Sequence, residues 1–265
     1  MTMLEVSQQG HIVTLTINRP DMRNALGEPG DGQVFFDVIA KINADRNVRC
    51  VILTGAGSAF SAGGNIKAMQ KREGPFEGGA MHVADGYRRG IHQIVKSLWG
   101  LEVPAIAAVN GPAIGLGNDV ACLCDMRIAS EKAIFGATFL KIGLIPGDGG
   151  AWLLPRIIGH ARASELLFTG NTVSAETALD WGLVSQVVSD DKLLETAHDM
   201  ATDISRQSSE SLRAAKRLMR HGQTSGFETV MEMSANAQAL VHVSEYHVEA
   251  VSAMLEKRSA EYQDK

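Results

Sequence analysis

Cysteine is scarce in this chain of 265 residues, which contains only Cys50, Cys122 and Cys124. An odd and sparse set does not form a disulfide framework, so the sequence predicts buried thiols and a reducing, cytoplasmic setting. Cys122 and Cys124 lack the second pair that a zinc knuckle requires, and we expect no metal site.

Basic charge and long apolar runs are also lacking. The formal net charge is −5 at pH 7 and the pI is near 5.9, so the basic surface that nucleic-acid binding requires is missing. No apolar run approaches the roughly 18–20 residues of a membrane helix, and the first residues do not form a secretory signal. We therefore expect no nucleic-acid partner and no membrane association.

Several catalytic motifs are absent as well. The sequence has no G-x-x-x-x-G-K-[ST] phosphate loop, no H-E-x-x-H zinc helix and no G-x-S-x-G serine elbow. The Gly55-Ala56-Gly57 turn lacks the third glycine of a dinucleotide fingerprint. His82 and His92 are ten residues apart, and His242 and His247 are five apart, so we expect neither pair to share a helix face.

What the chain does contain is an ordinary globular balance, with 45% apolar and 21% charged residues, enough to bury a sizeable core. In the first half, short apolar runs alternate with segments of helical periodicity. Strands are expected at residues 4–8, 13–17, 50–53 and 103–109, and helices at 34–42 and 82–99. This order is typical of βαβ units with parallel strands, and it predicts an α/β fold class.

The sequence after residue 150 has an almost wholly helical pattern. Helices are expected at residues 161–168, 175–181, 191–205, 210–220, 227–240 and 245–258. We therefore divide the chain into an α/β core, residues 1–200, and a helical C-terminal region, residues 201–265.

Two glycine-rich turns, Phe60–Lys67 and Asn110–Asp119, each follow a predicted buried strand. Small residues let a ligand approach the backbone closely, so one N–H from each turn can converge on a single oxygen as an oxyanion hole. A helix that starts near Gly117 would add its positive end. Either turn alone is an ordinary structural feature, but the pair favours a function.

Five motifs together resemble those of the crotonase superfamily, the enoyl-CoA hydratase/isomerase family. They are Asn18-Arg19-Pro20, Asn24-Ala25-Leu26, Phe60-Ser61-Ala62-Gly63, Ala107-Ala108-Val109-Asn110-Gly111 and Ile145-Pro146-Gly147. The resemblance implies a crotonase-like spiral ββα core that binds a CoA thioester, and a C-terminal region that trimerises and covers the active site. It further implies a homotrimer or a dimer of trimers, and an acyl-CoA substrate of which coenzyme A is part, without a separate cofactor.

The same resemblance assigns binding roles residue by residue. The two oxyanion donors become the backbone N–H groups of Gly64 and Leu116. Ala25 and Ala62 match backbone positions near the adenine of coenzyme A.

Two lysines are also implied in CoA binding by the resemblance. Lys67 and Lys257 match family lysines that approach the phosphates, and Lys257 does so from a neighbouring subunit. A solvated charge on a helix is the structural alternative for both lysines.

The proton-transfer groups depart from the hydratase pattern, in which two glutamates position and activate water. The first matching position holds Asp119, and the second holds Phe139, which cannot transfer a proton. Asp148 stands instead where dienoyl-CoA isomerases of the family carry an aspartate. Burial beside Phe139 is expected to raise the pKa of a carboxyl toward neutrality. The structural alternatives are a helix-dipole role for Asp119 and an ordinary turn role for Asp148.

We therefore predict an enzyme of fatty acid metabolism that holds a thioester enolate and shifts the double bond of an enoyl-CoA, with Asp119 and Asp148 moving the protons. The first alternative is an enoyl-CoA hydratase that adds water to a 2-enoyl-CoA. The second is an acyl-CoA binding protein without catalytic activity, which the missing acid at position 139 favours.

Overall fold

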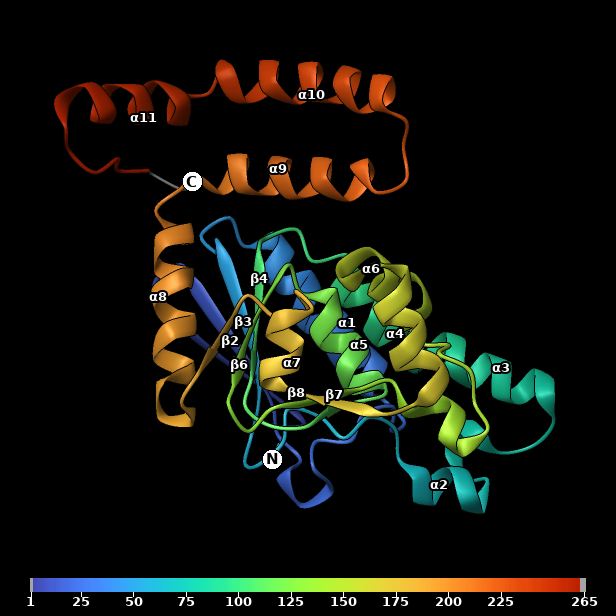
Figure 1. Cartoon of the computed structure of the whole chain (residues 1–265). Coiled ribbons are helices and arrows are strands. Elements are labelled where there is room, and N and C mark those ends of the chain that lie inside the picture. The colour runs from blue at the N-terminus through green and yellow to red at the C-terminus, as the bar shows by residue number, and fades with distance from the viewer. Residues whose placement is uncertain (1, 263–265) are drawn as a thin grey trace.

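The computed structural model describes residues 2–262 and centres on a six-stranded sheet with helices on both sides (Figure 1). In spatial order the strands are β1 (Leu4–Gln9), β2 (Ile12–Ile17), β3 (Cys50–Gly55), β4 (Ala105–Val109), β6 (Met126–Ser130) and β9 (Gln186–Val188). β1 and β2 form an antiparallel hairpin, and all further neighbours pair in parallel. The four predicted strands are confirmed, and the predicted parallel pairing is confirmed for β2, β3 and β4.

Helices cover both faces of this sheet. The α-helices of residues 2–262 are α1 (Asp31–Ala44), α2 (Ile66–Lys71), α3 (Ala80–Arg89), α4 (Ile91–Trp99), α5 (Leu116–Leu123), α6 (Gly150–Thr169), α7 (Ala175–Asp180), α8 (Leu193–Ser205), α9 (Ser209–Gly222), α10 (Phe227–His242) and α11 (Glu245–Glu256). α8 lies on one face, whereas α1, α4 and α5 lie on the other (Figure 1). α9, α10 and α11 form a separate layer that extends away from the sheet.

Alternating side chains of the central strands fill two cores. Along β3, Leu53 belongs to the larger core, while Cys50 and Ile52 belong to the smaller core under α8. Every residue of β3 and β4 is buried, which explains why their sequences are continuous apolar runs. Cys50, Cys122 and Cys124 are free and buried, as predicted, and burial raises the pKa of each thiol to about 12.

The prediction of one continuous helix over residues 82–99 is wrong. It is divided into α3 and α4 at Gly90, whose φ of −108° and ψ of −91° are not helical. A β-carbon on Gly90 would lie 2.9 Å from the Gly86 carbonyl oxygen, so the sharp break suits a glycine.

The expectation of an almost wholly helical second half missed two short strands. β8 (Thr172–Ser174) and β9 contain three residues each, too few to show an alternating pattern. The remaining predicted helices are present, but α6 begins at Gly150 rather than 161 and bends at Gly159, where φ is +76°. His242 and His247 do not share a helix face, because they lie on the consecutive helices α10 and α11, but the turn between these helices brings their ring centroids to 4.5 Å.

Two buried cations attach α9 to the core. Arg213 donates to Glu102 Oε2 at 2.8 Å and to the carbonyl oxygens of Asn43 and Asp45 at 3.0 and 2.9 Å. Lys216 Nζ lies 2.7 Å from Asp125 Oδ2. These contacts connect the start of the outer helical layer to the loops that end α1 and precede β4 and β6.

Replacing Arg213 with alanine should detach α9 and lower the free energy of unfolding by about 3 kcal/mol, because several buried acceptors lose their donor together. Urea unfolding at fixed protein concentration measures the change. Arg206→Ala, which removes an exposed pair with Asp203, is the matched control and should leave the midpoint unchanged. Equal midpoints for the two variants would contradict an anchoring role.

Candidate active site

The two glycine-rich turns meet at Ser61. Its N–H donates to the Pro112 carbonyl at 3.1 Å, and its carbonyl accepts from Ile114 N at 3.0 Å. A β-carbon on Gly117 would collide with the Ser61 carbonyl oxygen. A β-carbon on Gly63 would lie 2.5 Å from the Ile114 carbonyl oxygen. Glycine is therefore required at both positions for the turns to approach this closely.

This approach brings the two predicted oxyanion donors near each other. Leu116 is the first residue of α5, and a β-carbon on the neighbouring Gly63 would lie 3.4 Å from Leu116 N. Leu26 N donates to the Gly63 carbonyl at 2.8 Å and fixes the strand-like bridge that contains Gly64. Within residues 2–262, neither the Gly64 nor the Leu116 N–H donates a hydrogen bond to another protein atom. Both amides therefore remain available to a ligand oxygen.

Asp119 lies one turn into α5 and has no exposed surface. Its Oδ2 accepts from Gly150 N at 2.8 Å, so the first residue of α6 holds the carboxylate. Burial, and then the charge of Asp148, raises the pKa of Asp119 to about 7.

Asp148 precedes α6 in a turn between Gly147 and Gly149, the latter at φ +114°. The side chain is 5% exposed and makes no hydrogen bond with residues 2–262, and burial raises its pKa to about 6. Gly150, two residues after Asp148, donates its N–H to Asp119, so the structure brings these two predicted site residues near each other as buried acids.

An aromatic cluster that the sequence did not reveal surrounds the Asp148 turn. His92 Nε2 lies 3.0 Å from the Gly147 carbonyl oxygen, so this nitrogen must carry the proton. The Tyr87 ring lies 5.9 Å from that of His92, and burial followed by the charge of Asp148 raises the pKa of Tyr87. No motif predicts Tyr87 or His92, because they reach the turn only through the packing of α3 and α4.

An apolar cavity of about 400 Å³ is lined by residues of α2 and α3, beside the site. Met69 on α2 lines it and contacts Gly64, since a β-carbon on that glycine would lie 2.7 Å from the methionine methyl group. Tyr87 lines it on the Asp148 side, together with Phe76 of the 3-10 helix η2 (Gly74–Phe76). Neither the two amide donors nor the two acids line this cavity, so it neighbours the site through Met69 and Tyr87.

Phe139 lies in the 3-10 helix η3 (Thr138–Ile142) and is buried. Its ring would be 3.8 Å from a β-carbon on Gly115, the residue before the Leu116 donor. The position that would hold a second hydratase acid therefore presents an apolar ring to the turn.

The four residues assigned to coenzyme A separate into two groups. Ala25 and Ala62 lie on adjoining loops, and Ala62 N donates to the Arg23 carbonyl at 2.9 Å. Lys67 is exposed on α2, beside the site. Lys257 is exposed at the end of α11, at the opposite side of the chain from α2 (Figure 1), so one subunit does not bring it to the site.

The raised pKa of Asp119 makes stability depend on pH. The folded value near 7 exceeds the ordinary 3.8, so the folded state holds the proton more tightly and loses stability as pH rises from 4 to 7. The unfolding temperature of Asp119→Asn, measured relative to that of wild type, should therefore be higher at pH 8 than at pH 5. Each unit by which the pKa is raised corresponds to about 1.4 kcal/mol in the free energy of unfolding.

Thermal unfolding at both pH values measures this difference, and Asp37→Asn on the exposed side of α1 serves as control. A difference between Asp119→Asn and wild type that is constant with pH would mean that Asp119 titrates normally.

No helix within residues 2–262 is long and apolar enough to cross a membrane. No group of three metal-ligating side chains was found in the same part of the chain.

Comparison with known proteins identifies the family. The sequence profile described as enoyl-CoA hydratase/isomerase matches residues 7–265. The chain is 36% identical over 254 residues to 1,2-epoxyphenylacetyl-CoA isomerase of Escherichia coli K12, covering 96% of this chain and 95% of that protein. It is 34% identical to the short-chain-enoyl-CoA hydratase of Clostridium acetobutylicum, covering 97% and 95%.

A solved structure agrees with the sequence relatives. The crystal structure of an enoyl-CoA hydratase from Bacillus anthracis superposes with a TM-score of 0.92 at 33% identity, covering all of both chains. The predicted crotonase-like α/β fold is confirmed. The chain belongs to the enoyl-CoA hydratase/isomerase family, and it is an enzyme of that family.

Proposed function

We propose that this enzyme moves the double bond of an enoyl-CoA by taking a proton from one carbon of the acyl chain and returning it to another. One observation carries the proposal. Asp119 and Asp148 are a pair of buried acids with pKa values raised to about 7 and about 6, while position 139 holds an apolar ring. Near neutral pH such a pair both accepts and donates protons.

The two free amides would receive the thioester oxygen. Removing a proton from the acyl chain breaks a C–H bond, and its electron pair moves into the conjugated system and onto the thioester oxygen. The N–H groups of Gly64 and Leu116 stabilise that charge, each by roughly 2.7–4 kcal/mol as in measured oxyanion holes. The positive end of α5 acts at the same place.

Returning the proton to a different carbon completes the shift. The electron pair moves back from the oxygen, a new C–H bond forms and the double bond lies elsewhere in the chain. One carboxyl removes the proton and the other, or the same one, delivers it. Coenzyme A arrives as part of the substrate, and this proton transfer requires no separate cofactor and no bound water.

Water addition is the second candidate function. It is favoured by the names of relatives such as the Clostridium acetobutylicum hydratase, and by the carboxylate at Asp119. In this reaction Asp148 would replace the second hydratase acid, because Phe139 cannot transfer a proton.

Product masses distinguish these candidates. The enzyme is incubated with 2-enoyl-, 3-enoyl- and dienoyl-CoA in deuterated water, and isomerisation should give exchange or double-bond migration without an added water. Asp148→Asn should reduce turnover at least about 100-fold, the scale of general acid–base catalysis. Asp37→Asn, an exposed acid of α1, should retain full activity.

Stoichiometric addition of water would overturn isomerisation in favour of hydration. Binding without turnover of any of these thioesters would contradict both reactions.

We further propose that the chain forms a homotrimer or a dimer of trimers in a reducing, cytoplasmic setting. The layer of α10 and α11 exposes large apolar side chains, among them Leu240, Val243, Met254 and Leu255, each at least 75% exposed. An exposed apolar surface of this kind favours a protein partner. A neighbouring subunit could then supply Lys257, which lies away from the site of its own chain.

Native mass spectrometry should give three or six times the chain mass. Leu240→Glu combined with Met254→Glu should lower this mass, because each places a charge on the proposed interface. Val6→Glu, at an exposed residue of β1, should not change it. A monomeric wild-type protein would contradict the proposed assembly.

A further inference from the structure

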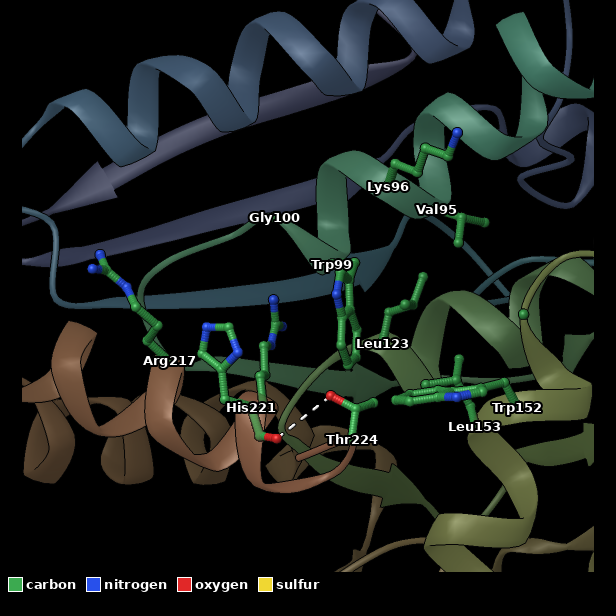
Figure 2. A pocket seen from close by; sticks show the side chains of 12 residues that line it. Val95, Lys96, Trp99, Gly100, Leu123, Trp152, Leu153, Arg217, His221 and Thr224 are labelled. Carbon is green, nitrogen blue, oxygen red and sulfur yellow. Dashed lines mark hydrogen bonds between the residues drawn. The ribbon is translucent and has the colours of Figure 1, made fainter. Parts of the chain in front are cut away.

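A second apolar cavity, of about 650 Å³, lies between α4, α5, α6 and α9 (Figure 2). Trp99 of α4 and Trp152 of α6 form its walls together with Leu123 and Leu153. The two tryptophan rings meet edge to face, with centroids 5.1 Å apart. This volume lies within the range of cavities that hold small organic ligands.

The polar part of this cavity carries positive charge. Arg217 and Arg220 of α9 and Lys96 of α4 line it, and none of its described lining residues is an acid. An apolar ligand with a negative group would match both parts of the lining.

Arg220 is the most enclosed of these cations. Its side chain is 16% exposed, and its guanidinium lies over Trp99, 4.4 Å from the ring centroid. Its nearest carboxylate oxygen is Asp125 Oδ1 at 3.9 Å, while Asp125 Oδ2 already accepts from Lys216 and Ala105 N. The guanidinium makes no hydrogen bond with residues 2–262, so its charge is only partly compensated.

The cavity is distinct from the reaction centre. Gly149 lines it, but Asp119, Asp148 and Tyr87 do not. The first turn of α6 separates the two sites, since Gly150 N holds Asp119 and Trp152 faces the cavity.

From this combination we propose that the cavity binds a small apolar carboxylate, with its ring or chain against Trp99 and Trp152 and its carboxylate paired with Arg220. A planar guanidinium suits a carboxylate, and the indole rings suit an apolar or aromatic body. The highly charged phosphates of a nucleotide do not fit the apolar walls. This proposal goes beyond the thioester reaction and does not depend on which reaction is catalysed.

The test titrates the native enzyme with phenylacetate and with octanoate, and follows tryptophan fluorescence and binding heat. Trp181→Phe is used as background, so that Trp99 and Trp152 are the remaining tryptophans. Binding should be saturable, and the uncharged 2-phenylethanol should bind at least about tenfold more weakly than phenylacetate, because it lacks the charge-assisted pairing. This comparison requires no change at Arg220.

Arg220→Gln should weaken phenylacetate at least about tenfold while leaving 2-phenylethanol unchanged. Arg162→Gln is the control, because Arg162 also lies beside an aromatic ring, that of residue 181, but does not line the cavity. Equal affinities for the charged and neutral ligands, or no saturation at millimolar concentrations, would overturn the proposal.

Two further outcomes would also overturn it. One is displacement of phenylacetate by butanoyl-CoA at one equivalent, which would place the probe in the thioester site. The other is failure of acrylamide to quench Trp99 and Trp152 in the native oligomer, which would mean that a neighbouring subunit fills the cavity.

Discussion

The hydrogen-bonded contact between the turns at Ser61 and Ile114 is the constraint on which the site depends. It joins the chain after β3 to the chain after β4, at a separation that a side chain on Gly117 would not permit. The same contact leads into β5 (Ala113–Ile114), which pairs with β7 (Ile134–Gly136) and thereby fixes the start of α5. Two amide groups from distant parts of the sequence become neighbours as a result.

The second constraint is the burial of two acids without a cation beside them. Asp119 obtains one backbone donor from Gly150, and Asp148 obtains no partner within the described chain. Burying a carboxyl in this way disfavours its charged form, and at Asp119 the charge of Asp148 adds to the effect. Because the pKa of Asp119 is raised to about 7, this residue stabilises the folded state less as pH rises toward neutrality.

Much of this site could be predicted from the sequence, because the relevant signals are local. Glycine-rich turns after apolar strands indicate where a backbone can approach a ligand, and Asp119 and Asp148 stand within those motifs or next to them. The predicted carboxyl pKa values near neutrality agree with the burial observed. The assignments of catalytic roles remain predictions.

Other features depend on contacts between distant segments and left no pattern in the sequence. The three residues of β9 are a strand only because β6 offers them an edge. His92 reaches the Gly147 carbonyl because α4 packs beside the turn before α6. In the sequence, Arg213 looks like any exposed cation of a helix. Only the packing of α9 over the end of α1 brings it to the Asn43 carbonyl oxygen.

The proposed oxyanion donors belong to the main chain, and this has a consequence for how the enzyme can diverge. Every residue except proline carries an N–H, so position 116 can hold leucine without losing the donor. Glycines at the turn contact are fixed by steric exclusion, whereas the proposed proton-transfer groups at 119 and 148 are side chains. Under the proposed function, exchanging those side chains would alter where protons are placed without removing either amide donor. In that mechanism the main chain would hold the charged oxygen, whereas the side chains would determine which carbon receives the proton.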